Sequence, residues 1–234
     1  MSTSHASAQG SSAHDEHHGP AFLQHHFETP EQQFSTAKLG MWAFLAQEVL
    51  FFSGIFVAYG IFRSWYPESF SVGSHFLNWR LGAANTLVLL FSSLTAALAV
   101  RSSQVGEKRK TTIYLAITIV CACIFMVVKY FEYSHKFHVG LLPGEYFREQ
   151  THLPEGITRV PYHIRSFLGI YFMATGVHGL HVLVGIGVLV WILIRNERGE
   201  FGPDYYTPVD IAALYWHLVD LIWIYLFPLL YLID

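Results

Sequence analysis

Ionisable side chains inside long apolar stretches are the residues of this sequence whose types could do chemistry. Glu48 is the only charged residue within residues 39–62. A charged side chain at mid-bilayer costs roughly 2.5 to 3.5 kcal/mol on insertion scales, so the presence of Glu48 there requires an explanation. Glu48 is either a functional carboxyl group or a neutral acid that is hydrogen-bonded to a neighbouring helix. We favour the functional role, because a Gln or Ser would make a purely structural hydrogen bond at lower cost.

Other ionisable residues occur in pairs three positions apart, a spacing that places both side chains on one face of a helix. The pairs are His178 and His181, Lys129 and Glu132, and His217 and Asp220. The two acid–base pairs could each form an intrahelical ion pair that lowers the cost of inserting the helix into a membrane. The spacing alone does not distinguish this structural role from a functional role of the same residues.

The two histidines of the fourth apolar stretch allow three interpretations. A metal ion would need three or four ligands, and this pair supplies two. Hydrogen bonds to other helices or to lipid headgroups are favoured, since Gly176, Gly179 and Gly185 beside the pair predict a close helix contact. A transmembrane b-type haem held by His217 together with one of these histidines is a further alternative.

Five apolar stretches must position these residues. They cover residues 39–62, 81–100, 111–133, 166–194 and 209–233. Each reaches the ~20 residues that a helix needs to cross ~30 Å of hydrocarbon. Because lipid offers the backbone no hydrogen-bond partners, such stretches must be helical. The sequence therefore predicts an all-α, polytopic membrane protein with a five-helix transmembrane domain over residues 35–234.

Residues 1–34 are polar and rich in histidine, unlike the rest of the sequence. Such a segment cannot bury enough apolar surface to offset its ordering entropy, so we expect a disordered tail. Short loops that are rich in Lys and Arg stay on the cytoplasmic side of a membrane. The connections at 101–110 and 195–198 are rich in these residues, which places the tail and Lys38 inside and the C-terminus outside.

Composition excludes several classes of protein. The 14 Lys and Arg against 17 Asp and Glu give a net charge of -3, without a basic block that could follow a nucleic-acid backbone. Cys121 and Cys123 fall on nearly opposite sides of a helix, so we expect no disulfide and two small buried side chains. Motifs for a dinuclear copper centre, covalent haem attachment, a P-loop or a nucleophile triad are absent from the sequence, so we expect no complete redox centre and no metal site in this chain.

Five segments, taken in order and spacing, resemble subunit III of the haem-copper terminal oxidases, and most closely the cytochrome c oxidase branch. They are KLGMWAFLAQEVLFFSGIF (38–56), AANTLVLLFSS (83–93), KYFEYSHKF (129–137), FMATGVHGLHVLVG (172–185) and YWHLVDLIWIYLF (215–227). The ubiquinol oxidase branch is the alternative, although its carboxylate helix tends to have Asp at the position of Glu48. A small proton transporter is a weaker alternative, since the sequence shows no internal repeat.

This resemblance implies a short, five-helix bacterial form whose helices make a V-shaped bundle with a lipid-filled cleft. It implies that the chain carries no cofactor beyond structural phospholipid, and that the haems and copper belong to partner subunits I and II in the inner membrane. Glu48 matches the carboxylate known for carbodiimide reactivity, and Lys38 and Arg195 match cationic positions that contact lipid phosphates. The implied roles are to sustain proton uptake into subunit I, to limit its inactivation during turnover and to guide dioxygen. Membership of a respiratory supercomplex is left open.

Overall fold

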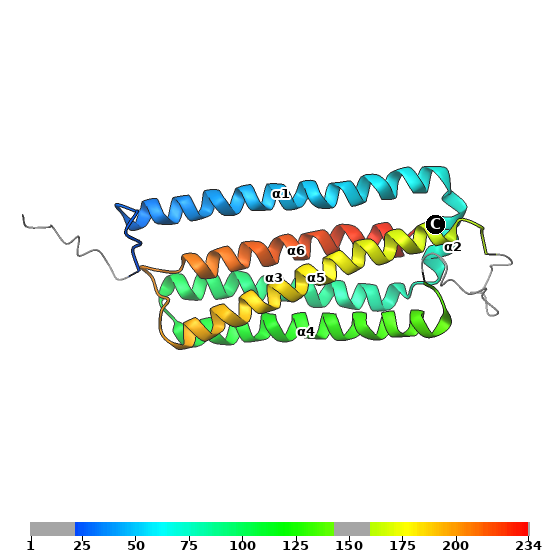
Figure 1. Cartoon of the computed structure of the whole chain (residues 1–234). Helices are drawn as coiled ribbons and strands as arrows, with labels where there is room; N and C mark the ends of the chain where they lie inside the picture. Colours follow the sequence, from blue (N-terminus) through cyan, green and yellow to red (C-terminus); the bar gives the residue numbers. More distant parts are fainter. Residues whose placement is uncertain (1–21, 143–159, 234) are drawn as a thin grey trace, which may run out of the picture.

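Five long helices and one short helix make up the part of the chain that the structure, a computed structural model, describes: residues 22–142 and 160–233 (Figure 1). They are α1 (Pro30–Trp65), α2 (Pro67–His75), α3 (Trp79–Val105), α4 (Lys108–Val139), α5 (Ile164–Glu197) and α6 (Thr207–Tyr231). All except α2 are long and apolar enough to cross a membrane. The predicted all-α, multi-pass membrane fold is confirmed.

Local capping groups set the helix ends, and they make the helices longer than the apolar stretches. Thr29 caps α1 by accepting a hydrogen bond from the Gln32 amide, and Pro30 occupies the first turn. Gly106 and Gly140 end α3 and α4 with φ of 81° and 79°, a left-handed conformation that glycine adopts without steric cost. Helix α1 therefore begins inside the segment that was predicted to be disordered. Of the rest of that segment, residues 22–29 form turns and bends before α1, and residues 1–21 lie outside the described residues.

Helix α2 was not predicted, because a nine-residue helix is too short to be found by counting membrane spans. Proline starts it, and its buried Gly73 packs against α5. A Cβ at Gly73 would lie 2.3 Å from the Phe167 ring, so only glycine allows this approach. The short helix follows α1 in the chain and packs the end of α1 against the start of α5.

Helices α3, α4, α5 and α6 surround a common core, and α1 packs along α5 and α6 at one side of this bundle (Figure 1). The largest fully buried core side chains include Phe125, Tyr171, Trp216 and Trp223. Many large apolar side chains on the outer faces are exposed, as lipid contact requires. Cys121 is buried, but Cys123 is exposed on the outer face of α4, so the prediction of two buried thiols was wrong for Cys123.

One glycine allows α5 and α6 to approach closely. A Cβ at Gly185 would lie 3.0 Å from the Trp216 ring, so the small residue lets the indole pack directly on the α5 backbone. A separate apolar cavity of about 390 Å³ lies between α1, α5 and α6, with Met41, Trp191 and Tyr215 among its lining residues. The V-shaped, lipid-filled cleft stays a prediction.

Candidate functional site

Glu48 and His181 meet across the contact between α1 and α5. The Oε2 atom of Glu48 lies 3.1 Å from Nε2 of His181. The carboxylate side chain is 11% exposed and the imidazole is 19% exposed, so both are mostly screened from the lipid face. The Phe52 ring packs edge-on against the imidazole with ring centres 5.2 Å apart. The predicted intramembrane acid thus has as its partner one of the two predicted histidines.

The contacts of the two ring nitrogens of His181 indicate how protons are arranged in this pair. Nδ1 of His181 lies 2.8 Å from the Val177 carbonyl oxygen, and a carbonyl only accepts, so Nδ1 carries a hydrogen. Glu48 and Nε2 of His181 then share one further proton: the acid donates to a neutral imidazole, or an imidazolium donates to a carboxylate. The pair has zero net charge in both forms, which suits an apolar environment.

Helix α6 holds His181 from the other side. The Tyr215 hydroxyl donates to the His181 backbone carbonyl at 3.0 Å, and its ring lies 6.0 Å from that of Phe44 on α1. Three helices therefore converge at the level of the acid–imidazole pair.

A second polar cluster lies near the C-terminal end of α4 and is centred on Glu132. Its Oε2 accepts from Lys129 Nζ at 2.8 Å, and its Oε1 accepts from Lys136 Nζ at 2.7 Å. Tyr171 and Tyr231 donate to Oε1 at 2.9 and 2.6 Å. Lys129, Glu132 and Lys136 are 6%, 8% and 2% exposed, so this is a buried ion triad.

The structure confirms the predicted pairing of Lys129 with Glu132 and enlarges it. Lys136 and the two tyrosines were missed. The signal for Lys136 was present, since it follows Glu132 by four residues and therefore shares its helix face. The tyrosines come from α5 and α6, and no local spacing relates them to α4.

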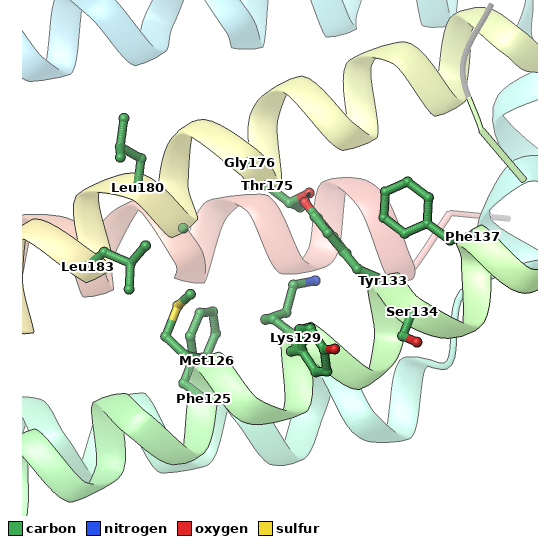
Figure 2. Close-up of a pocket in the computed structure, with 12 residues that line it drawn as sticks. Phe125, Met126, Lys129, Tyr133, Ser134, Phe137, Thr175, Gly176, Leu180 and Leu183 are labelled. Carbon is green, nitrogen blue, oxygen red and sulfur yellow. Dashed lines mark hydrogen bonds between the residues drawn. The ribbon is translucent and has the colours of Figure 1, made fainter. Parts of the chain in front are cut away.

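A groove of about 510 Å³ between α4 and α5 reaches this cluster at Lys129 (Figure 2). Figure 2 shows Leu183 of α5 facing Phe125 and Met126 of α4 across the groove, with Lys129 beside them. Gly176 and Gly179 line the groove, and a Cβ on either would meet nothing within 4 Å. The close helix contact that was predicted for the three α5 glycines is therefore made by Gly185 and not by these two.

His178 lies in the core, away from Glu48. It is 1% exposed and packs between the rings of Phe125 and Trp223, at 5.7 and 5.2 Å. Neither ring nitrogen has a hydrogen-bond partner among the described residues. Two histidines three residues apart thus have different surroundings, because one faces the α4–α6 core and the other faces α1.

The predicted pairing of His217 with Asp220 is not formed. Nδ1 of His217 lies 2.7 Å from the Ser93 hydroxyl of α3, and Asp220 Oδ1 has no hydrogen-bond partner among the described residues. Packing of α3 against α6 brings Ser93 to the imidazole, and this contact replaces the local pair. His217, His178 and His181 therefore contact different helices, and the described ranges 22–142 and 160–233 contain no group of three or more potential metal ligands.

Lys38 and Arg195, the predicted rim cations, lie at the same end of the bundle, where α1 and α6 begin and α5 ends (Figure 1). Lys38 Nζ is 3.3 Å from Asp210 Oδ2, which links α1 to α6. Arg195 Nε is 2.5 Å from Glu200 Oε2, and its guanidinium lies 4.8 Å over the Trp191 ring. Both cations therefore have a carboxylate partner within the chain.

Comparisons with known proteins agree on one family. The family model described as cytochrome c oxidase subunit III matches residues 160–234. The chain is 30% identical over 200 residues to cytochrome c oxidase subunit 3 of Corynebacterium diphtheriae, which covers 84% of this chain and 87% of the relative. It is 31% identical over 204 residues to the subunit 3 of Thermostichus vulcanus, with 84% and 87% covered. It is also 32% identical over 216 residues to that of Papio hamadryas, with 89% and 73% covered. This chain belongs to the cytochrome c oxidase subunit III family and is a multi-pass component of an oxidase complex.

Proposed function

We propose that this chain is the non-catalytic subunit III of a proton-pumping cytochrome c oxidase, and that the Glu48–His181 pair supports proton uptake into subunit I. In this proposal subunits I and II carry the haems and copper, and this chain binds structural phospholipid. The names of the relatives and the Glu at position 48 favour cytochrome c as the electron donor over ubiquinol. The acid–imidazole pair is the observation that carries the proposal.

The geometry suits a site that stores one proton within a neutral pair in the membrane. With 3.1 Å between Oε2 and Nε2, one proton can move between the acid and the imidazole while the pair stays neutral. Loss of that proton to a neighbour would leave the Glu48 carboxylate opposite an unprotonated Nε2, so another proton must enter before the pair is neutral and hydrogen-bonded again. The partial exposure of both side chains allows a neighbouring subunit to complete the site.

The proposed location is the bacterial inner membrane, with the N-terminal end of α1 on the cytoplasmic side. The α3–α4 turn and the end of α5 lie at the same end of the bundle as the start of α1 (Figure 1). Those two connections carry Arg101, Lys108, Arg109, Lys110, Arg195 and Arg198. Clustering of these residues at one end supports this orientation.

Co-purification tests the proposed function directly. A tagged form of the full chain, solubilised in a mild detergent, should bring down companion subunits together with the visible spectrum of their haems. Chain separated from those companions should lose that spectrum. A stoichiometric haem signal retained by the separated chain would contradict the proposal and favour a membrane cytochrome, as would purification of the chain without any oxidase companion.

We also propose that Lys38 and Arg195 hold phospholipid at the cytoplasmic rim. Changing both to Met is expected to reduce the lipid retained by the complex and to shorten the number of turnovers before inactivation, because each cation can donate to a phosphate beyond its carboxylate partner. Lys110→Met is the matched control, since Lys110 is an exposed cation at the same end and pairs locally with Glu107. An unchanged lipid count by native mass spectrometry would reject this role.

A further inference from the structure

A cavity of about 650 Å³ lies at the end of the bundle opposite Lys38 and Arg195. It is formed where the connection between α2 and α3 and the first turn of α3 approach the last turns of α4 (Figure 1). Its lining includes His75, Trp79, Arg80, Phe131, His135 and Lys136. A volume of this size lies within the ~300 to 1,000 Å³ that small-molecule sites occupy.

The charge of this cavity favours an anion. Arg80 has no carboxylate partner among the described residues, and its guanidinium lies 5.7 Å over the Trp79 ring. Glu132 is the only acid in the lining, and its two oxygens already accept from the lysines and tyrosines of the buried cluster. The ion triad beneath the cavity contains two lysines and one glutamate, so it offers the cavity no spare negative charge.

Two imidazoles add hydrogen-bonding groups to the same cavity. Nδ1 of His75 lies 2.8 Å from the Ser71 carbonyl oxygen and therefore donates to it. Its Nε2 atom has no partner among the described residues. His135 is exposed and lies one residue before the buried Lys136 on α4. The guanidinium of Arg80 offers a planar fork of donors, and His135 can add a donor from one ring nitrogen, a combination that suits phosphate oxygens.

The outer edge of the cavity is apolar and faces the membrane. Trp79, Leu81 and Phe131 line it and are 54%, 42% and 65% exposed. Exposed tryptophan beside arginine at the end of a membrane helix is typical of the boundary between headgroups and hydrocarbon. A ligand here would have its charged part on the cationic side and its apolar part along α3 and α4.

We propose that this cavity binds the phosphate of an anionic phospholipid, with Arg80 and His135 donating to the phosphate and the acyl chains lying on Trp79, Leu81 and Phe131. The site belongs to the leaflet opposite that of Lys38 and Arg195, and it does not depend on the role of the Glu48–His181 pair. The combination of cationic donors with an exposed apolar edge selects a lipid over a soluble anion.

Photocrosslinking in the intact complex tests this site. The probe is phosphatidylglycerol with a diazirine near the top of one acyl chain, in phosphatidylcholine vesicles, and a phosphatidylcholine probe of the same design is the neutral comparison. Peptide mapping should place the phosphatidylglycerol label on Trp79, Leu81 or Phe131. Arg80→Gln should lower this labelling about fivefold, as expected for the loss of one cationic contact at a membrane surface.

Two further variants distinguish lipid binding in the cavity from a general attraction of anionic lipid by surface cations. His135→Gln should also lower the labelling, and Arg101→Gln should not, because Arg101 is an exposed cation near the other end of the same helix α3. The visible spectrum of each complex reports whether assembly is intact. Equal labelling by the two lipids, or labelling unaffected by Arg80→Gln and His135→Gln, would overturn the proposal.

The same assay distinguishes other occupants. Inorganic phosphate, compared with chloride at the same ionic strength, should leave the phosphatidylglycerol label unchanged. Displacement of the label by phosphate alone would identify a site for a soluble anion and overturn the lipid assignment. Absence of any label on Trp79, Leu81 and Phe131 in the unmodified complex would mean that another part of the complex fills the cavity, and this too would overturn it.

Discussion

Replacing Glu132 with leucine is expected to prevent accumulation of the folded chain. The change leaves Lys129 and Lys136 buried without their carboxylate, and it removes the acceptor of the Tyr171 and Tyr231 hydroxyls. Breaking a buried ion pair by removing one partner costs about 3 to 5 kcal/mol. Since a typical domain is stable by only about 5 to 15 kcal/mol, the free energy of unfolding in mixed micelles should fall sharply. The amount of chain in the membrane should fall with it.

A matched set of variants separates the loss of a counter-ion from the loss of packing. Removing all three charges together, as Lys129→Met, Glu132→Leu and Lys136→Met, should recover most of the stability, because no uncompensated charge is left. Glu107→Gln breaks the exposed pair with Lys110 and should change stability by less than about 1 kcal/mol. If Glu132→Leu alone behaved like Glu107→Gln, the triad would not be a coupled ionic cluster.

The membrane helices could be predicted from the sequence because they depend on a property of each segment alone. An apolar stretch of sufficient length needs no partner to be recognised. Their ends depend on local caps, and here the prediction was less accurate. The Thr29–Pro30 start of α1 follows a common capping pattern, but the polar composition around it favoured a disordered tail. Helix α2 escaped notice because it is short and rich in serine.

The polar sites show the limit of spacing rules more clearly. A separation of three residues predicted the contact between Lys129 and Glu132 correctly, yet the same separation failed for His217 and Asp220. In the second case Ser93 of another helix supplies the partner. The contact between Glu48 and His181 joins residues 133 positions apart, so it follows from the packing of α1 on α5 and from no local pattern.

A hydrophobic carbodiimide is expected to label Glu48, and Glu48→Gln should reduce the label on the chain to background. The reagent reacts with a protonated carboxyl group that it can reach from the membrane. Glu48 has a proton within its pair and a partly exposed side chain. Glu132 and Asp220 are two further buried acids. Both oxygens of Glu132 accept from lysines or tyrosines, which protects it, and Asp220 is 3% exposed and therefore less accessible from the membrane than Glu48. Peptide mapping after labelling separates the three acids, and a label on α4 or α6 that persists in Glu48→Gln would contradict the assignment.

The role of the pair, as opposed to the reactivity of one acid, is tested by combining two variants. In the purified oxidase complex, Glu48→Gln and His181→Gln should each reduce the number of turnovers before inactivation, because either change removes the group that shares the proton. If the two side chains act as one proton-holding unit, the double variant should be no worse than the more severe single variant, since coupled residues are not additive. Glu68→Gln, which changes an exposed acid on α2, should leave turnover unchanged. Losses that add in the double variant would show that Glu48 and His181 act separately, and the proposal that their shared proton supports the neighbouring subunit would fail.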